Sequence, residues 1–462
     1  MKTYQDLLAV GERDSDRLEF VRQLINEHKS SNLYQDAVVA NQYFKRHNVT
    51  IEAYQKLLYT VTGQAVPDNY SANWKMKHGF FHLFVTQEVQ HLLGNGVQWQ
   101  DAKTPDKLGE DIDTQAMRAA KAALIGGCSF GFYNKDHVEV FKVTEFAPLY
   151  DEEDGALKAG VRFWQIDDSK PLRATFYEPD GYTEYIWRDS EGQILKDKRP
   201  YIIMIRQSEA DGTEIYDGRN YPGFPIVPMW ANEEHLSALD GIREQIDCYD
   251  LIKSGFANDV DDASLIYWTI QNAGGMDDID LAKFVERMHT LKAATVDADG
   301  ATAEAHTMDV PFGSREALLD RLKDDLYMDA MALDLKNISG GGATTATQII
   351  ASYKPLDSKC DDLEYCVLQW LSGILSLAGI DGEKPSFTRD YIVNKAEEVQ
   401  TIIQAAEYLS DDYKTRKILT ILGDGDKADE VLKDMVADAY DRLNMQEEEE
   451  PQEGTEQEAQ EA

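Results

Sequence analysis

The feature that most limits how this chain can fold is a single long apolar stripe in its second half. Apolar residues recur there at intervals of three or four, which is the spacing of one helix face. They are Leu239, Ile242, Ile246, Tyr249, Ile252, Phe256 and Val260. The spacing predicts an amphipathic helix about 30 Å long, since each residue adds about 1.5 Å. An apolar stripe of that length has to be buried against other elements or other chains.

A second amphipathic helix is predicted after a mixed, loop-rich stretch over residues 263–311. We expect it to begin near Ser314, a residue type favoured at helix N-caps. Leucines occupy one of its sides, and acidic residues recur at every fourth position on the other: Glu316, Asp320 and Asp324. Residues four apart share a helix face, so these three carboxylates form one acidic stripe. By itself, such a stripe is most often a solvated surface.

The rest of the chain divides by the period of its hydrophobic pattern. Residues 1–125 repeat at helical spacing, whereas residues 129–230 alternate with period two and predict antiparallel hairpins. Residues 346–377 predict a long helix kinked at Pro355, and residues 394–443 predict two or three short helices. We therefore expect an α+β fold that is rich in helix.

A glycine-rich loop separates the second amphipathic helix from the long kinked one. It reads Ser339-Gly340-Gly341-Gly342-Ala343-Thr344-Thr345 and resembles a phosphate-binding loop only loosely. The lysine of the phosphate-binding signature is missing, and no strand precedes the loop. A hinge or mobile loop is the favoured interpretation.

The charge balance excludes several classes of partner. The sequence holds 84 acidic and 46 basic residues, a formal net charge of −38. Polyanions repel such a chain, so neither a general nucleic-acid coat nor a peripheral membrane protein is expected. Residues 445–462 contain eight glutamates and no basic residue, which predicts a disordered acidic tail. The absence of a long apolar run or an apolar N-terminal region favours a soluble, non-secreted protein whose four cysteines stay reduced.

Signals for catalysis are weak. His78 and His82 have a spacing that would place both rings on one helix face, but the glutamate of the metalloprotease signature is missing. Asp259, Asp261 and Asp262 could form part of a two-metal cluster, yet neighbouring carboxylates near a helix end usually face solvent. We expect no enzyme activity, no metal and no cofactor, and keep a metal-dependent hydrolase as the alternative.

Four pairs of short stretches, in their order and spacing, resemble the portal proteins of tailed bacteriophages. They are Asn73-Trp74-Lys75-Met76 with Leu92-Leu93-Gly94-Asn95, Gly126-Gly127 with Pro148-Leu149-Tyr150-Asp151, Phe224-Pro225-Ile226-Val227-Pro228-Met229 with Asp247-Cys248-Tyr249-Asp250, and Ser339-Gly340 with Thr345-Ala346-Thr347-Gln348-Ile349. The resemblance is to the family named for the portal of a Bacillus siphophage, and it extends from about Tyr34 to Tyr440. Gln348 departs from the pattern, which usually has glutamate there.

The resemblance implies a ring-shaped channel of about a dozen copies at one capsid vertex, through which double-stranded DNA is packaged and ejected. It divides the chain into a wing (1–233), a first stem helix (234–262), a clip (263–312), a second stem helix (313–334), a tunnel loop (335–345), a backbone helix (346–389), a crown (390–444) and the acidic tail (445–462). The expected partners are the large terminase ATPase, a head-completion adaptor, the major capsid and scaffold proteins, and DNA bound without sequence preference. We expect the protein in the virion, and in the host cytoplasm during assembly.

Residue roles follow from the same resemblance. The tunnel loop that would touch DNA comprises Lys336, Asn337, Ser339, Gly340, Gly341, Gly342, Thr344 and Thr345. The acidic lining of the channel would be Glu316, Asp320 and Asp324, because carboxylates repel a sliding duplex. The stem would pack through Leu239, Ile242, Ile246, Tyr249 and Phe256. Besides the hydrolase, a virion structural protein that oligomerises without a channel stays open as an alternative.

Overall fold

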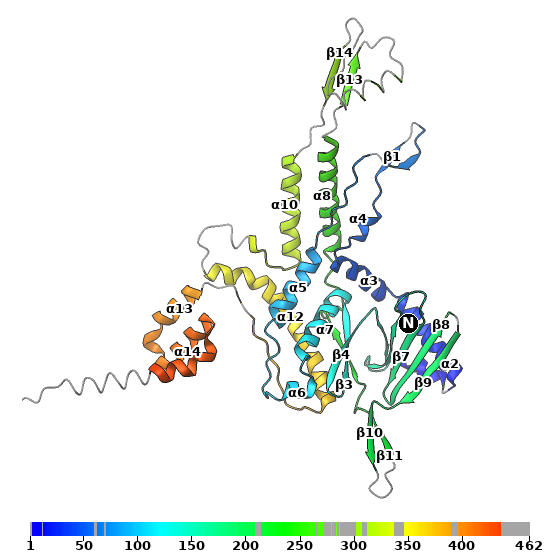
Figure 1. The fold of residues 1–462 in the computed structure, drawn as a ribbon, viewed down its shortest axis with the longest axis vertical. Helices are drawn as coiled ribbons and strands as arrows, with labels where there is room; N and C mark the ends of the chain where they lie inside the picture. The colour runs from blue at the N-terminus through cyan, green and yellow to red at the C-terminus, as the bar shows by residue number, and fades with distance from the viewer. Residues whose placement is uncertain are drawn as a thin grey trace, which may run out of the picture. The chain divides into compact units, whose positions relative to one another are not determined.

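The fold is described from a computed structural model, shown in Figure 1. The described residues are 2–11, 13–59, 62–68, 71–189, 191–207, 214–263, 267–271, 302–306, 312–336, 346–389, 391 and 395–435, with the single residues 279, 283 and 286. The chain forms two compact units, one of Met1–Leu333 with Pro355–Arg389 and one of Asp334–Lys354 with Asp390–Ala462. Helices and antiparallel sheets occur together, which confirms the α+β class.

The first part of the chain is largely helical, as its periodicity predicts. Short polar residues begin several helices: the Ser31 side chain accepts a hydrogen bond from the Tyr34 amide, and the Asn48 side chain accepts one from the Ile51 amide. The elements are α1 (Tyr4–Val10), α2 (Asp14–Lys29), α3 (Asn32–Phe44), α4 (Val49–Ala53), the hairpin β1 (Leu57–Tyr59) and β2 (Ala65–Pro67), α5 (Phe80–Leu93), α6 (Thr104–Leu108) and α7 (Ile112–Gly126).

The predicted hairpin region forms three antiparallel sheets. A five-stranded sheet runs in chain order through β5 (Phe146–Tyr150), β6 (Leu157–Trp164), β7 (Leu172–Glu178), β8 (Gly181–Arg188) and β9 (Glu191–Arg199). A three-stranded sheet has the order β12 (Ile226–Trp230), β3 (Cys128–Asn134) and β4 (His137–Lys142), and β10 (Ile202–Gln207) pairs with β11 (Glu214–Arg219). Helix α2 covers the larger sheet, burying Phe20, Leu24 and Ile25 in one core with Val161, Phe176 and Trp187.

The long helix α12 (Ala346–Ala378) confirms the prediction of a long helix in this part of the chain, and Pro355 lies inside it. Its Trp370 is fully buried and packs directly over Gly131, in the central strand of the three-stranded sheet. A Cβ atom at Gly131 would lie 2.5 Å from the indole nitrogen, so only glycine permits this approach. The contact fastens the helix to the sheet.

The two amphipathic helices are α8 (Arg243–Ala263) and α10 (Phe312–Asp329). Between them in the chain lie the paired strands β13 (Tyr267–Gln271) and β14 (Thr302–His306) (Figure 1). The predicted start of the first helix was wrong: Gly241 adopts a left-handed conformation (φ 81°), so α8 cannot extend back to Leu239. The second helix begins near Ser314 as predicted, but Ser314 lies inside its first turn and does not cap it.

The second unit contains the short C-terminal helices that the sequence predicts. These are α13 (Lys395–Gln404) and α14 (Asp411–Leu422), with 3₁₀ turns at Ala406–Tyr408 and Gly425–Lys427. Ser410 caps α14, and Gly423 ends it in a left-handed conformation, at the Gly423-Asp424-Gly425 stretch where the sequence predicts a break between the short helices. No helix in the described residues combines the length and apolar character needed to cross a bilayer.

All four cysteines are free thiols, as the sequence predicts. Cys128, Cys360 and Cys366 are buried, and Cys248 is exposed.

Candidate functional site

Helices α8 and α10 lie side by side and run antiparallel (Figure 1). Near the start of α8, the Gln245 amide donates a hydrogen bond to the Asp329 carboxylate at the end of α10. At the opposite end, Arg315 pairs with Asp259. Polar contacts at both ends therefore set the register of the pair.

An aromatic cluster joins the base of this helix pair to α5. The Tyr249 ring of α8 lies edge-on to Phe80, with centroids 5.0 Å apart. The Tyr327 ring of α10 packs against Phe84 at 5.2 Å and Phe80 at 6.4 Å. Edge-to-face packing of this kind is favourable beyond the area that it buries. One α5 surface therefore positions both helices.

The predicted stem-packing residues are largely buried within the chain itself. Leu239, Ile242, Ile246 and Tyr249 are all buried, and Phe256 stacks edge-on against Phe312 of α10 with centroids 5.5 Å apart. Leu239 and Ile242 contribute from the turn before the helix. The apolar stripe therefore has its partners inside one chain as far as Tyr249, beyond which it is only partly covered and Val260 is exposed.

A second, polar stripe runs along α8, and its three central residues are buried. It comprises Asp247, Asp250, Ser254, Asn258 and Asp261, spaced three, four, four and three apart. Asp250 has no exposed surface, while Ser254 is 6% and Asn258 8% exposed. Buried polar groups require hydrogen-bond partners. The partners come from residues 43–78, far away in the sequence.

Three backbone amides of that segment bond to the α8 stripe in regular succession. The Trp74 amide donates to Asn258 Oδ1 (2.6 Å), the Met76 amide to Ser254 Oγ (2.9 Å) and the His78 amide to Asp250 Oδ1 (3.2 Å). Two residues of extended chain span about 6.6 Å, close to the roughly 6 Å that four helical residues span. The two backbones therefore stay in step along the helix.

Side chains extend this ladder of amide hydrogen bonds at the end that lies near the start of α8. Asp250 accepts hydrogen bonds from Asn48 Nδ2 (2.9 Å) and from the His78 ring at Nδ1 (2.7 Å). Asp247 accepts from the hydroxyls of Tyr43 (2.5 Å) and Thr50 (2.7 Å). The sequence analysis missed this role, although the second stripe at helical spacing was visible beside the apolar one.

The metal-site hypothesis for His78 and His82 fails on geometry. His78 precedes α5 and bonds Asp250, whereas His82 lies within α5 and has its Nδ1 atom 3.0 Å from the Phe44 carbonyl oxygen. Asp259 and Asp261 also have other partners, Arg315 and the Trp74 indole. No group of three potential ligands is arranged around a metal position among the described residues.

The predicted acidic stripe of α10 faces solvent in this chain. Glu316, Asp320 and Asp324 are all exposed, and no ion pair neutralises them within the described residues. Of the tunnel-loop residues predicted to touch DNA, only Lys336 is among the described residues, and its backbone amide donates to the Asp334 carboxylate at 3.0 Å. The loop residues that lie outside the described part of the chain are Asn337, Ser339, Gly340, Gly341, Gly342, Thr344 and Thr345.

The chain that leaves α10 is fastened to α5 and α12. Gln87 on α5 accepts a hydrogen bond from the Leu333 amide and donates one to the Leu333 carbonyl, both at 3.0 Å. Lys359 on α12 pairs with the buried Glu88 at 2.8 Å and donates to the Ala330 carbonyl at 3.2 Å. Burial raises the pKa of Glu88, and the neighbouring ammonium opposes only part of that effect.

Comparison with known proteins identifies the class. The profile of the family described as "Phage portal protein, SPP1 Gp6-like" matches residues 23–439. The chain belongs to this family of phage portal proteins, which are structural components of the virion.

Individual relatives agree with the family match. The chain is 25% identical to the portal protein of Bacillus phage SPP1 over 416 residues, which cover 83% of this chain and 79% of that protein. It is 24% identical to the portal protein of Clostridium phage phiCD119 over 319 residues, covering 64% of this chain and 68% of the relative.

Proposed function

We propose that about twelve copies of this chain form a ring at one capsid vertex, and that double-stranded DNA passes through its central channel during packaging and ejection. Membership of the portal family supports the proposal. So does the antiparallel α8–α10 pair, which is held rigidly at its base and exposes one acidic face. The proposed site is that face: Glu316, Asp320 and Asp324 line the channel.

The physical argument concerns how strongly a channel wall holds DNA. Each lysine or arginine that contacts a phosphate releases counterions and slows sliding, whereas carboxylates repel the duplex and keep it centred. The acidic face carries no neutralising ion pair within the described residues, so its charge acts on whatever occupies the channel. Residues 335–345 would form the loop that touches the duplex, with Lys336 as their single basic side chain.

The domain roles expected from the sequence are part of the proposal. Residues 1–233 act as the wing, α8 and α10 as the stem, and residues 263–312 as the clip with its β13–β14 hairpin. Residues 346–389 act as the backbone helix and 390–444 as the crown. The clip docks the large terminase ATPase and later a head-completion adaptor, while the wing and crown meet capsid and scaffold proteins. The ATPase supplies the catalysis, and this chain acts as conduit and platform.

The first test is negative-stain microscopy of the purified full chain, with its mass measured in solution. We expect rings of about twelve copies with a central hole as wide as a DNA duplex, about 20 Å. Closed particles without a hole would refute the channel, and would favour a virion protein that only oligomerises.

A further inference from the structure

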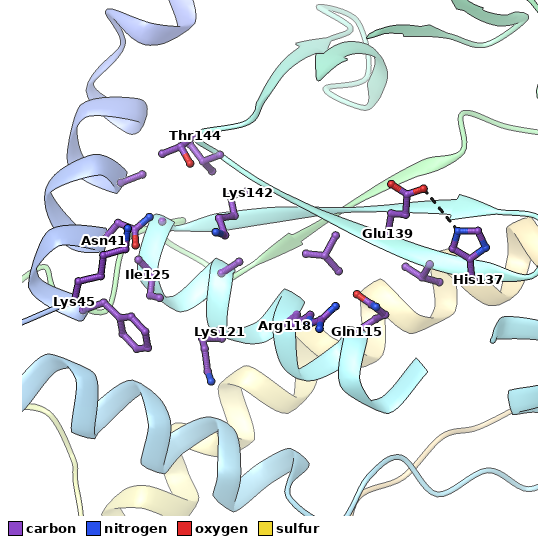
Figure 2. Close-up of a pocket in the computed structure, with 17 residues that line it drawn as sticks. Asn41, Lys45, Gln115, Arg118, Lys121, Ile125, His137, Glu139, Lys142 and Thr144 are labelled. Carbon is purple, nitrogen blue, oxygen red and sulfur yellow. Dashed lines mark ion pairs between the residues drawn. The ribbon is translucent and has the colours of Figure 1, made fainter. Parts of the chain in front are cut away.

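A basic groove lies between α3, α7 and β4, outside the helix pair described above. It encloses about 610 Å³, and the residues that line it are drawn in Figure 2. Its floor is apolar and includes Ala37, Phe44, Ala122, Ile125 and Val140. An apolar concavity of this size is suited to burying a side chain of a partner.

Cations from three different elements surround that floor. Lys45 follows α3, Arg118 and Lys121 stand on α7, and Lys142 ends β4 (Figure 2). In the described residues, no carboxylate pairs with Lys45, Arg118 or Lys121, and Lys142 has only a 3.7 Å contact to Glu145. The other three cations are thus unpaired within the described residues, although the chain as a whole has a net charge of −38.

The groove has little negative charge of its own. Its one carboxylate, Glu139, already pairs with Arg162 at 3.1 Å and lies 3.7 Å from His137. The neighbouring Asp136 and Glu139 raise the pKa of His137. The groove therefore favours an acidic occupant with an apolar anchor.

The loop between β6 and β7 has the complementary chemistry. Ile166 is 85% exposed at its tip, and Asp167 and Asp168 follow it on the surface. The loop is held in shape by its own hydrogen bonds: Gln165 Nε2 donates to the Lys170 carbonyl (2.9 Å), and the Ser169 amide donates to Asp167 Oδ1 (2.9 Å). A preordered loop loses less conformational entropy on binding.

We propose that the β6–β7 loop of one copy docks in the basic groove of the next copy around the ring. Ile166 rests on the apolar floor, while Asp167 and Asp168 pair with Arg118 and Lys121. The inference rests on the proposed ring, because it assigns one contact between neighbouring copies. Groove and loop are different patches of one chain, so the same contact can repeat head to tail from copy to copy until the ring closes. It also supplies local attraction between subunits that otherwise repel.

Charge reversal with rescue tests the pairing. Arg118→Glu with Lys121→Glu, and separately Asp167→Lys with Asp168→Lys, should each raise the protein concentration needed for half-maximal assembly at least tenfold. Combining all four changes in one chain should restore assembly, because the charges are again opposite. Glu153→Lys with Glu191→Lys is the matched control, since both residues are exposed and lie outside the loop and the groove.

Cross-linking supplies a readout that needs no stable ring. In a Cys248→Ser background, Arg118→Cys with Asp168→Cys should give disulfide-linked ladders, and either cysteine alone should not. If the double-cysteine variant formed rings without disulfide-linked ladders, and every charge-reversal variant still formed rings, the loop would not dock in the groove. The proposed ring would be unaffected by that result. Ladders without rings would support the docking and refute the ring. If the groove variant formed normal rings but no longer bound a separate acidic protein, that protein would be the occupant of the groove, and a second copy of this chain would not.

Discussion

Replacing Asp250 by alanine should detach the segment 74–78 from α8 at His78, near the start of the helix. The carboxylate is fully buried and accepts hydrogen bonds from Asn48 Nδ2, the His78 ring and the His78 amide. Alanine would leave all three donors without this acceptor; Asn48 is buried, whereas the His78 side chain is 30% exposed. Breaking a buried, charge-assisted network costs about 3–5 kcal/mol.

The loss should be measurable as a lower melting temperature of the first unit. That unit contains roughly 370 residues, so its unfolding entropy near the midpoint is about 0.8 kcal/mol/K. A loss of about 4 kcal/mol then lowers the midpoint by about 5 °C, which differential scanning calorimetry resolves. Asp247→Ala is the matched control one turn earlier, because its partners are two hydroxyls and its side chain is only partly buried. We expect that control to cost about 1 kcal/mol, or 1–2 °C.

The comparison of the two variants decides the argument. If Asp250→Ala melted no lower than Asp247→Ala, the buried ladder would not be what holds this segment to the helix. If Asp250→Ala lowered the melting temperature by several degrees but Asp250→Asn melted like the parent, the shape of this side chain would matter and its charge would not.

Three further predictions follow. Gly131→Ala should destabilise the protein by about 1–3 kcal/mol or more, because the new methyl group would meet a buried indole, whereas Gly223→Ala, with open space around it, should melt within 1 °C of the parent. Burial lowers the pKa of His28, so as the pH falls the imidazole is protonated in the unfolded chain before it is protonated in the folded one. Stability is therefore lost as the pH falls below about 6.5. His28→Gln should show a shallower fall in melting temperature between pH 7 and pH 5. Asp320→Lys with Asp324→Lys should slow DNA passage in a packaging assay at low salt and leave α10 folded, and unchanged packaging would mean that this face points away from DNA.

Local periodicity predicted most of the helices and strands. The hairpin region, α12 and the break at Gly423 all follow from patterns that nearby residues impose on one another. The start of α8 could not be predicted from the stripe alone. Leu239 and Ile242 keep helical spacing although Gly241 turns the backbone aside, because burial in a turn needs the same apolar residues as burial in a helix.

The buried polar stripe escaped prediction for a different reason. Acidic and hydroxyl residues on one face of a helix usually indicate solvent, and Asp250 looks no different in the sequence from the exposed Asp320. Only the tertiary fold brings Asn48 and His78 against one of them. The role of the α10 acids in turn depends on neighbouring copies, which a single chain does not contain.

The ladder on α8 also has a mechanical consequence. Its three amide contacts, at Asp250, Ser254 and Asn258, span about 12 Å of the helix axis. A beam fastened at several points bends less than one clamped at its end. A load applied to the β13–β14 end is therefore shared among these contacts, and passes through His78 into α5, which begins two residues later. Helix α8 therefore transmits force into the core along its length, and does not bend at its first turn.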